Sequence, residues 1–279
     1  QSEEINIYTQ HVKEISKNKD GWNLVWSEEF EQESNIPNAK SWSLAAKEAS
    51  PWNRYMSESY DQAYVKDGKL YLIAEKKDGE YKTGGVWTMD KVGFKYGKLE
   101  VCAKFTSFQG GWAAIWLMPQ ERQYPSVNNS YPGEIDIMEM IGAENEDLNG
   151  KSNKKVYQTL HAGSAADVDH SKSISTYTLP KGIFNDDYHI FGLNWSKNKM
   201  EFYVDNKIVG SIDYSNNEEY KRCFNRPQYI QMNLATGGNW AGDAGDNLAG
   251  QKYEIDYVYY GQNAQQKADS KEYYENAIK

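Results

Sequence analysis

Short strand-like runs, separated by turn signals, recur from residue 21 to residue 261 and constrain the fold more than any other feature. Most of them are rich in β-branched and aromatic residues, which favour strands. Few helical periods lie between the runs, and the sequence shows no internal repeat or mid-chain linker. The clearest runs are GKLYLIAEK, YGKLEVCAKF, WAAIWLM, KVYQTLHAG, YHIFGLNWS and YEIDYVYYG. This pattern predicts a single all-β domain, built as a sandwich or a barrel.

The two ends of the chain are polar and are expected to lie outside this domain. Residues 1–20 are weakly patterned, which suggests a tether or a tail packed on the surface. Residues 262–279 are also polar and could form a short helix. The chain starts at Gln1 within a polar stretch, so an export signal or a lipid-anchored segment could have been removed. We therefore expect a secreted or cell-surface protein.

The acidic composition excludes one class of partner. The 279 residues include 31 basic and 40 acidic side chains, giving a net charge of −9, whereas nucleic-acid binders usually present a basic field. No apolar run approaches the roughly 18–20 residues that span a bilayer. The only cysteines are Cys102 and Cys223, too few for a disulfide framework, and whether they pair is left open. We expect a monomer without a transmembrane segment or a nucleic-acid partner.

The segment GEIDIMEMIG, residues 133–142, carries three carboxylates within an apolar strand-like run. In a flat strand Glu134 and Asp136 would share one face, whereas Glu139 would fall on the face of the isoleucines. An unpaired carboxylate there would lose its hydration at a cost of several kcal/mol. One surplus residue, assigned to Met138, would return Glu139 to the face of the other two acids. The register therefore predicts a β-bulge at 137–138.

Three carboxylates on one face repel one another, so at least one should hold its proton longer than a free side chain would. A retaining glycosidase uses two carboxyl groups about 5–5.5 Å apart, one as nucleophile and one as proton donor. Backbone positions two apart on one strand face lie ~6.6 Å apart, so two side chains that lean toward each other can bring their carboxyl groups to roughly this separation. An inverting enzyme would instead need ~6.5–9.5 Å between the carboxyl groups. A solvated polar strand and a calcium site are the non-catalytic alternatives.

Aromatic and polar residues near this strand are candidate substrate contacts. In QGGWAAIWLMP, Trp112 and Trp116 share a face and lie four residues, or about 13 Å, apart, so that both could stack on sugars of one substrate chain, with burial in the core as the alternative. In KVYQTLHAG, His161 could bond to Asp136 or Glu139 and influence their protonation. Further candidates in SPWNRYMS and GGNWAG are Trp52, Arg54, Asn239 and Trp240.

Together these motifs resemble glycoside hydrolase family 16, in its laminarinase and β-glucanase branch, over roughly residues 21–261. The resemblance rests on NLVWSEEF, YGKLEVCAKF, GGWAAIWLMP, GEIDIME, YHIFGLNWS, MNLATGGNWAG and IDYVYYG. It implies a β-jelly-roll sandwich of two curved antiparallel sheets with a concave substrate cleft. It also implies roles for three residues: Glu134 as the nucleophile, Asp136 as an assisting carboxylate and Glu139 as the acid/base.

The resemblance implies that catalysis needs no cofactor, and that a structural Ca²⁺ could bind at Glu29, Gly68 and Asp256. The expected function is that of a secreted, retaining endo-glucanase, which cleaves β-1,3 or mixed β-1,3/1,4 glucan by double displacement. An agarase- or porphyranase-like galactanase is the first alternative, in which Arg54 and Arg122 would meet sulfate or galactose groups. A non-catalytic sugar-binding module is another, although it would have no use for crowded acids, and a transglycosylase remains open. The long segment before Glu134 is expected to form a wall of the cleft.

Overall fold

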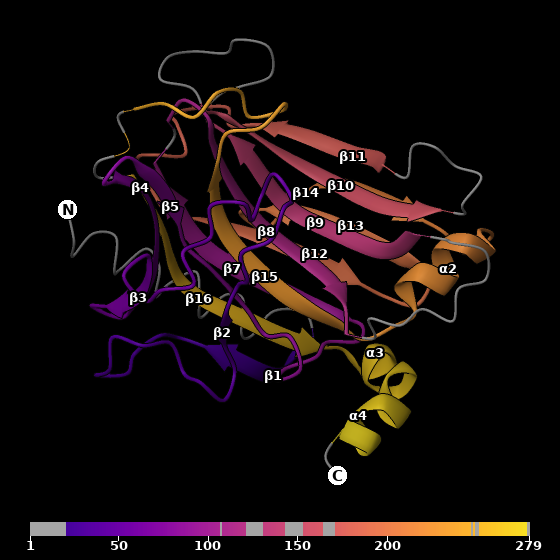
Figure 1. Cartoon of the computed structure of the whole chain (residues 1–279). Helices are drawn as coiled ribbons and strands as arrows, with labels where there is room; N and C mark the ends of the chain where they lie inside the picture. The colour runs from indigo at the N-terminus through magenta and orange to yellow at the C-terminus, as the bar shows by residue number, and fades with distance from the viewer. Residues whose placement is uncertain are drawn as a thin grey trace.

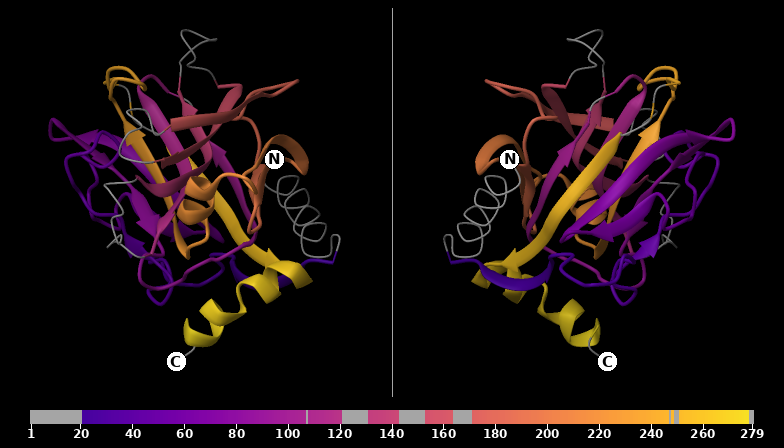
Figure 2. Two further views of the ribbon diagram at one scale, coloured as in Figure 1. Left: turned by 90° about the vertical axis from the view of Figure 1, so that its right-hand side faces the viewer. Right: turned by 90° about the vertical axis from the view of Figure 1, so that its left-hand side faces the viewer.

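The computed structural model describes residues 21–106, 108–120, 131–142, 153–163, 171–246, 248 and 251–277. Within these ranges the chain forms two antiparallel sheets that pack face to face (Figures 1 and 2). This arrangement confirms the expected all-β jelly-roll sandwich. The amino-terminal tail and Arg122 lie outside the described residues, as does most of the segment expected to form a cleft wall.

The larger sheet has nine strands, and seven of them form its main path. In spatial order these are β14 (Lys207–Asp213), β13 (Lys199–Val204), β12 (His189–Trp195), β7 (Gly97–Phe105), β16 (Lys252–Gln262), β4 (Lys69–Lys77) and β3 (Ala63–Lys66). Off this path, β16 pairs with β1 (Asn23–Glu28), and β4 pairs with β5 (Glu80–Thr83).

The smaller sheet has seven strands and carries the three acids near its middle. In spatial order the strands are β11 (Ser171–Thr178), β10 (Lys155–Gly163), β9 (Tyr131–Ile141), β8 (Gly111–Pro119), β15 (Gln228–Thr236), β6 (Gly85–Trp87) and β2 (Ser43–Leu44). Sequence order and spatial order differ, so residues far apart in the chain become neighbours across the sheet.

The hydrophobic core fills the space between the two sheets and follows the two-residue period of the strands. In β8, Ala113, Ile115 and Leu117 are buried in this core. The alternating residues Trp112 and Trp116 point to the opposite face, away from the larger sheet. Burying a side chain such as Ile or Leu contributes roughly 1.5–3 kcal/mol, so the alternation fixes which face of β8 points outward.

The predicted bulge is present in β9. Strand β8 pairs Ile115 with Met138 and Trp116 with Asp136, so the register skips Ile137. On the other side, β10 pairs Tyr157 with Glu139 and Thr159 with Asp136. Two residues along β10 therefore span three residues along β9. Both bulge residues are buried in the core, and the three acids all line the opposite face. The bulge is therefore confirmed, but the surplus residue is Ile137 rather than Met138, because Met138 keeps a regular cross-strand partner.

Short helices cover the ends of the sandwich. Helix α2 (Glu218–Phe224) begins after Asn217, whose side chain caps the backbone N–H of Tyr220, and it packs against β9 and β10. Helices α3 (Ala264–Asp269) and α4 (Lys271–Ala277) follow β16 at the carboxyl end (Figure 2). Of the helices in the described ranges, none has the length and apolar character to cross a membrane.

The two cysteines lie apart in these elements. Cys102 is in β7 and Cys223 is in α2. Both side chains are buried, and no disulfide joins them. The question that the sequence left open is therefore answered: the sandwich is held together without a bridge between them.

Deleting Ile137 should remove the bulge and leave Glu134, Asp136 and Glu139 at every second position of a regular strand, so that Glu139 stays on the cleft face. We expect the loss of turnover to stay below the roughly 100-fold that a ~1 Å misplacement of a catalytic group can cause, since Asp136 and Glu139 keep their partners Trp116 and Ala114 in β8. Turnover is measured on folded protein, with circular dichroism and the unfolding midpoint recorded for each variant. Ile137→Val is the control, because it keeps the bulge and should lower stability by only about 0.5–1.5 kcal/mol. A folded deletion variant that no longer hydrolyses the substrate would contradict the register.

Candidate active site

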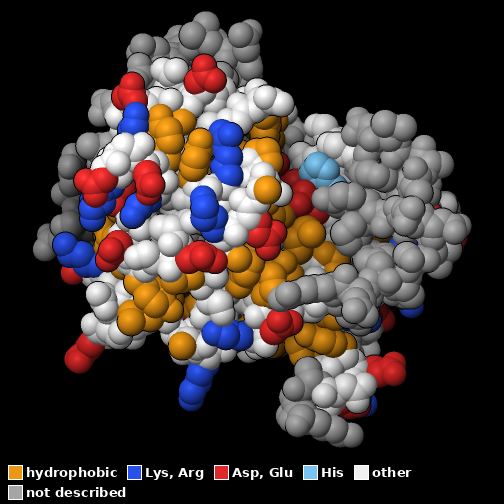
Figure 3. All heavy atoms as spheres, viewed as in Figure 1, with side chains coloured by type: hydrophobic (Ala, Val, Ile, Leu, Met, Phe, Trp, Pro, Cys, Tyr) orange, Lys and Arg blue, Asp and Glu red, His pale blue; other side chains and the backbone are white. Residues whose placement is uncertain are grey.

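A cleft of about 350 Å³ lies on the outer face of the seven-stranded sheet. The space-filling view shows hydrophobic and acidic side chains beside a histidine where this face is hollowed (Figure 3). Strands β8 to β11 and β15 supply most of the lining, and two loop tryptophans complete it. The lining residues are Trp52, Trp112, Ala114, Trp116, Glu134, Asp136, Glu139, Thr159, His161, Ser171, Asn233 and Trp240.

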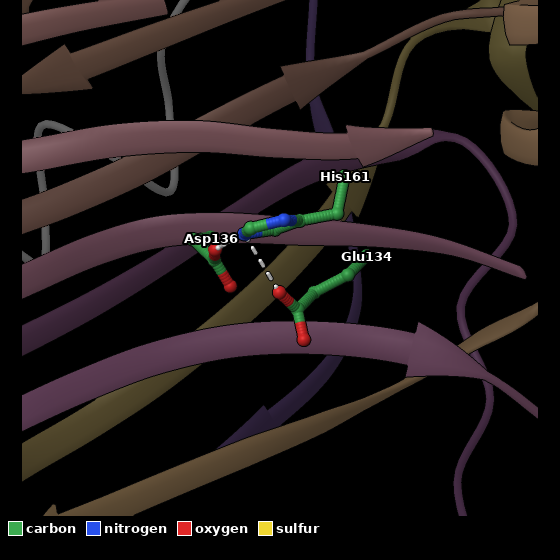
Figure 4. A group of neighbouring side chains, drawn as sticks. All are labelled: Glu134, Asp136 and His161. Carbon is green, nitrogen blue, oxygen red and sulfur yellow. Dashed lines mark hydrogen bonds and ion pairs between the residues drawn. The ribbon is translucent and has the colours of Figure 1, made fainter. Parts of the chain in front are cut away.

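The imidazole of His161 lies between two of the three carboxylates (Figure 4). Its Nε2 atom is 3.0 Å from Glu134 Oε2 and 2.9 Å from Asp136 Oδ2. The contact follows from the register, because His161 stands opposite Glu134 in the β10–β9 pair. The predicted bond to Asp136 is confirmed, and the second acid in contact is Glu134 rather than Glu139.

Asp136 is the middle member of the acid row and interacts with both of its neighbours. Its carboxyl lies close enough to those of Glu134 and Glu139 that the three groups influence one another's pKa. Carboxyl groups this close repel one another when ionised, which favours the protonated form. The raised pKa values therefore agree with the expectation that at least one of the acids holds its proton longer than a free side chain.

Burial is the main electrostatic influence on all three acids. It raises the pKa of Glu134 well above its usual value, and the charge of Asp136 adds to this effect, whereas His161 partly opposes it. Burial followed by repulsion from Glu139 likewise raises the pKa of Asp136, which is only 3% exposed. Burial also raises the pKa of Glu139. The cleft thus favours protonated carboxyl groups, as a proton donor requires.

Trp112 has a polar role that its position in the sequence did not suggest. Its indole Nε1 donates a hydrogen bond to Glu139 Oε2 at 2.9 Å. This bond lowers the pKa of Glu139 and so partly opposes the effect of burial. It also fixes one carboxylate oxygen, which leaves the other oriented for chemistry. Trp112 is therefore a positioning residue for Glu139, whether or not its ring also stacks on a sugar.

Asn233 is a cleft residue that the sequence reasoning missed. Its Oδ1 atom accepts a hydrogen bond from Trp116 Nε1 at 2.8 Å, and the side chain is only 1% exposed. Its Nδ2 has no hydrogen-bond partner among the described residues. A buried amide donor left unpaired in a cleft wall is suited to a substrate oxygen. The two-residue period of QYIQMNLAT was the available signal, because it puts Asn233 on the outer face. In the structure Asn233 pairs with Ala114 of β8.

Two of the predicted loop tryptophans stand at the cleft. The ring of Trp52 meets the ring of Trp116 edge-on, with centroids 4.9 Å apart and planes at 85°. The ring of Trp240 meets Trp112 in the same way, at 5.8 Å and 84°. All four indoles line the cleft. Their suitability for stacking on sugars remains a prediction.

The other two loop candidates are not among the described residues that line the cleft. The guanidinium of Arg54 packs on the ring of Tyr55, 4.7 Å from its centroid. Its Nη2 atom also approaches Gly237 closely, at 2.7 Å from the position of an added Cβ. Asn239 is exposed in the loop after β15. The structure therefore brings Trp52 and Trp240 to the acids but gives Arg54 a packing role.

The comparison with known proteins places this geometry in a family. The model of "Glycosyl hydrolases family 16" matches residues 48–259, a range that includes all three acids. The chain belongs to glycoside hydrolase family 16. Membership confirms the resemblance found in the sequence motifs.

Individual relatives of this family member differ in their substrates. The keratan-sulfate endo-1,4-β-galactosidase of Sphingobacterium multivorum is 30% identical over 247 residues, which cover 85% of this chain and 54% of the relative. Glucan endo-1,3-β-glucosidase A1 of Niallia circulans is 28% identical over 270 residues, covering 85% and 37%. The laminarinase catalytic domain from Thermotoga maritima MSB8 has a TM-score of 0.72 at 27% identity, covering 88% of this chain and 99% of that one. The chain thus spans about half or less of the length of these two curated relatives.

The residues implied as calcium ligands lie away from the cleft, on the nine-stranded sheet. Glu29 follows β1, and its Oε1 accepts a hydrogen bond from the hydroxyl of Tyr259 at 2.6 Å. Burial, the bond to Glu29 and the charge of Asp256 all raise the pKa of Tyr259, so both carboxylates lie near one phenol. Gly68 forms the turn between β3 and β4, with φ of +72°. Two carboxylates and a backbone carbonyl are oxygen donors of the kind that suit Ca²⁺.

Replacing Trp112 by Phe should move the alkaline limb of the pH–rate profile to higher pH. Without the indole donor, the pKa of Glu139 rises, so a general acid at this position keeps its proton to higher pH. We also expect a lower kcat, because the carboxyl is no longer held in place. The profile of kcat/KM against pH gives the position of the limb, and kcat is measured at saturating substrate. Trp195→Phe removes a buried indole bond to the carbonyl of Phe224 and should leave the limbs unchanged. A shift of the alkaline limb to lower pH would contradict the assignment.

Replacing His161 by Gln should move the acid limb to higher pH. The histidine lowers the pKa of Glu134, so its loss raises that pKa, and the carboxylate then ionises only at higher pH. The control is His189→Gln, because His189 also contacts a carboxylate, at 2.6 Å from Asp205, but lies in β12 of the other sheet. An acid limb that stays in place in the His161 variant, or moves equally in both variants, would refute this role.

Proposed function

We propose that the protein is a retaining endo-β-glucanase that hydrolyses β-1,3 or mixed β-1,3/1,4 glucan. The observation that carries the proposal is the row of Glu134, Asp136 and Glu139, which one bulge aligns on the floor of a single cleft. Two of the relatives, a glucan endo-1,3-β-glucosidase and a laminarinase, support the glucan assignment. A purely sugar-binding module is disfavoured because buried, mutually repelling acids destabilise a fold that gains no chemistry from them.

In the first step, Glu139 donates its proton to the glycosidic oxygen while the carboxylate of Glu134 attacks the anomeric carbon. The bond from the anomeric carbon to the leaving oxygen breaks, and an ester joins Glu134 to the sugar. In the second step, Glu139 accepts a proton from water, which attacks the same carbon and releases Glu134. The raised pKa of Glu139 suits the donor role, and the approach of His161 favours an ionised Glu134.

The cleft offers contacts on both sides of the acids, which supports attack within a chain. Strand β8 and the indole of Trp52 lie to one side of β9, and strands β10 and β11 lie to the other. A polymer too large to enter a cell is the substrate that such a cleft fits, so we place the protein outside the cytoplasm. Competition between water and a sugar acceptor for the ester would decide whether transglycosylation accompanies hydrolysis.

An endo-β-galactosidase is the second candidate, and a specific observation favours it. The keratan-sulfate endo-1,4-β-galactosidase is 30% identical to this chain over most of its length, which is at least as similar as the glucanase relative named above. The agarase- or porphyranase-like alternative has less support, because Arg54 packs on Tyr55 and does not line the cleft. Parallel digests of laminarin, barley glucan, keratan sulfate and agarose separate these candidates.

We also propose that Glu29, Asp256 and the carbonyl of Gly68 hold a structural Ca²⁺. The two carboxylates lie near Tyr259, where a cation would relieve their repulsion. The ion would stabilise the fold and take no part in the reaction. Adding Ca²⁺ to chelator-treated protein should raise the unfolding midpoint, and an unchanged midpoint would refute the site.

Replacing Glu134 or Glu139 by Gln should lower kcat by several orders of magnitude without lowering stability. The amides remove the nucleophile or the proton donor, but they also remove a charge whose burial is unfavourable. An aryl glycoside distinguishes the nucleophile from the proton donor, because its leaving group departs without being protonated. The Glu139 variant should cleave it, whereas the Glu134 variant should not.

Glu254→Gln provides the matched control for these variants. Glu254 pairs with Lys104 at 3.5 Å on the nine-stranded sheet, away from the cleft, and its loss should leave kcat unchanged. Proton NMR of the first product should show retention of the β configuration. Near-parental kcat in either active-site variant, or an inverted product, would reject the mechanism.

A further inference from the structure

The cleft stops before the edge of the sheet that carries it. The seven-stranded sheet continues beyond β15 to β6 and β2, yet neither strand supplies a described residue to the lining. The outer-face residues of β15 are buried rather than open to solvent. Gln231, which pairs with both Trp116 and Trp87, is 2% exposed. Another part of the chain must therefore cover this end of the sheet.

The covering part is the connection from β2 to β3, residues 45–62, called here the β2–β3 segment. Its Met56 is 2% exposed and bridges to Thr83, and the backbone N–H of Ala45 donates to the carbonyl of Gly85 at 2.9 Å. An added Cβ at Gly85 would lie 3.1 Å from Met56 Sδ and 3.2 Å from Ala45 Cβ. The absence of a side chain at Gly85 is thus what lets the segment lie directly on β6.

The same segment is held from the opposite side by the loop that follows β15. The guanidinium of Arg54 lies on Tyr55 and comes within 2.7 Å of the position of a Cβ at Gly237, which has φ of +79°. A side chain at Gly237 would be strained and would push the guanidinium away. Two independent close approaches, at Gly85 and at Gly237, therefore fix the segment that carries Trp52.

Trp52 projects from this segment to the boundary of the cleft. Its ring stands at 85° to that of Trp116, so the two indoles form a right-angled corner. Trp116 is paired with Asp136, one strand spacing of about 4.8 Å from the catalytic strand. The corner therefore begins about one sugar ring from the reacting bond. The unpaired Nδ2 of Asn233, held by Trp116, lies at the same corner.

We propose that Trp52 and Trp116 form a terminal subsite, which holds one sugar beyond the reacting sugar and closes the cleft behind it. The inference rests on the proposed glycanase function. A third sugar on this side lies outside the cleft that the described residues line and makes no contact with them, so an internal segment of a polymer must rise away from the sheet there. On the opposite side, Trp240 is 43% exposed and Ser171 of β11 still lines the cleft, so the described lining there extends to the last strand of the sheet.

The test is a subsite map made with linear oligosaccharides from trisaccharide to octasaccharide, isotope-labelled at the reducing end. Bond-cleavage frequencies, combined with kcat/KM, give the contribution of each successive sugar on each side. In the parent, the second sugar on the side of Trp52 should raise kcat/KM, and the third sugar on that side should leave it unchanged. Trp52→Ala should remove the gain from the second sugar on that side alone, and Trp52→Phe should keep part of it.

Tyr60→Ala is the matched control, since Tyr60 is an exposed aromatic of the same segment that does not line the cleft. Its subsite map should equal that of the parent, and the unfolding midpoint of each variant confirms folding. A gain from the third sugar in the parent would overturn the terminal subsite. The terminal subsite would also be overturned if Trp52→Ala lowered kcat/KM equally for substrates with and without the second sugar. Both a β-1,3-glucan series and a β-1,4-galactoside series are used. Cleavage of neither series would instead refute the proposed function, and this inference with it.

Discussion

One surplus residue in β9 is the constraint on which the site depends. Ile137 has no cross-strand partner in β8, and its side chain is buried in the core with those of Ile135 and Met138. The burial of these three side chains holds the bulge in place, because flattening it would expose one of them or bury Glu139. The same packing that stabilises the sandwich therefore aligns the acids on its outer face. Hydrophobic packing on one side of a strand sets the chemistry on the other.

The alignment has an electrostatic penalty that the surrounding residues reduce. Burial raises the pKa of all three acids, which means that their charged forms are disfavoured in the folded protein. Because a raised pKa in an acid makes the folded state bind more protons, this penalty grows as the pH rises. His161 and the indole of Trp112 act in the opposite direction. A continuous core between two sheets can carry such a penalty, whereas a small domain could not.

The periodicity of single strands revealed the fold and the catalytic row. Alternation in β8 separates Trp112 and Trp116 from the core, and the odd spacing of Glu139 indicates the bulge. Contacts between elements could not be predicted in this way. Two hydrogen bonds, from Trp112 to Glu139 and from Trp116 to Asn233, depend on the order of strands across the sheet. The sequence does not state this order. Whether Ile137 or Met138 is the surplus residue of the bulge depends on how two similar side chains fill the core.

Loop residues were the least predictable because composition does not show where a loop lies. Trp52 and Arg54 are two positions apart in SPWNRYMS, yet one indole enters the cleft and one guanidinium packs against Tyr55. Two glycines in distant elements decide this outcome by allowing close approach of the β2–β3 segment. A sequence motif can therefore supply the right kind of side chain for sugar binding without showing which residue meets the sugar.

The most direct test of the aligned acids is a crystal structure of the protein after reaction with an activated 2-deoxy-2-fluoro glycoside of the substrate sugar. Such a reagent traps the ester of a retaining enzyme. The account predicts a bond from a carboxylate oxygen of Glu134 to the anomeric carbon, with Glu139 on the same face of β9 and directed at the sugar. An adduct on another residue, or a Glu139 side chain turned into the core, would contradict it.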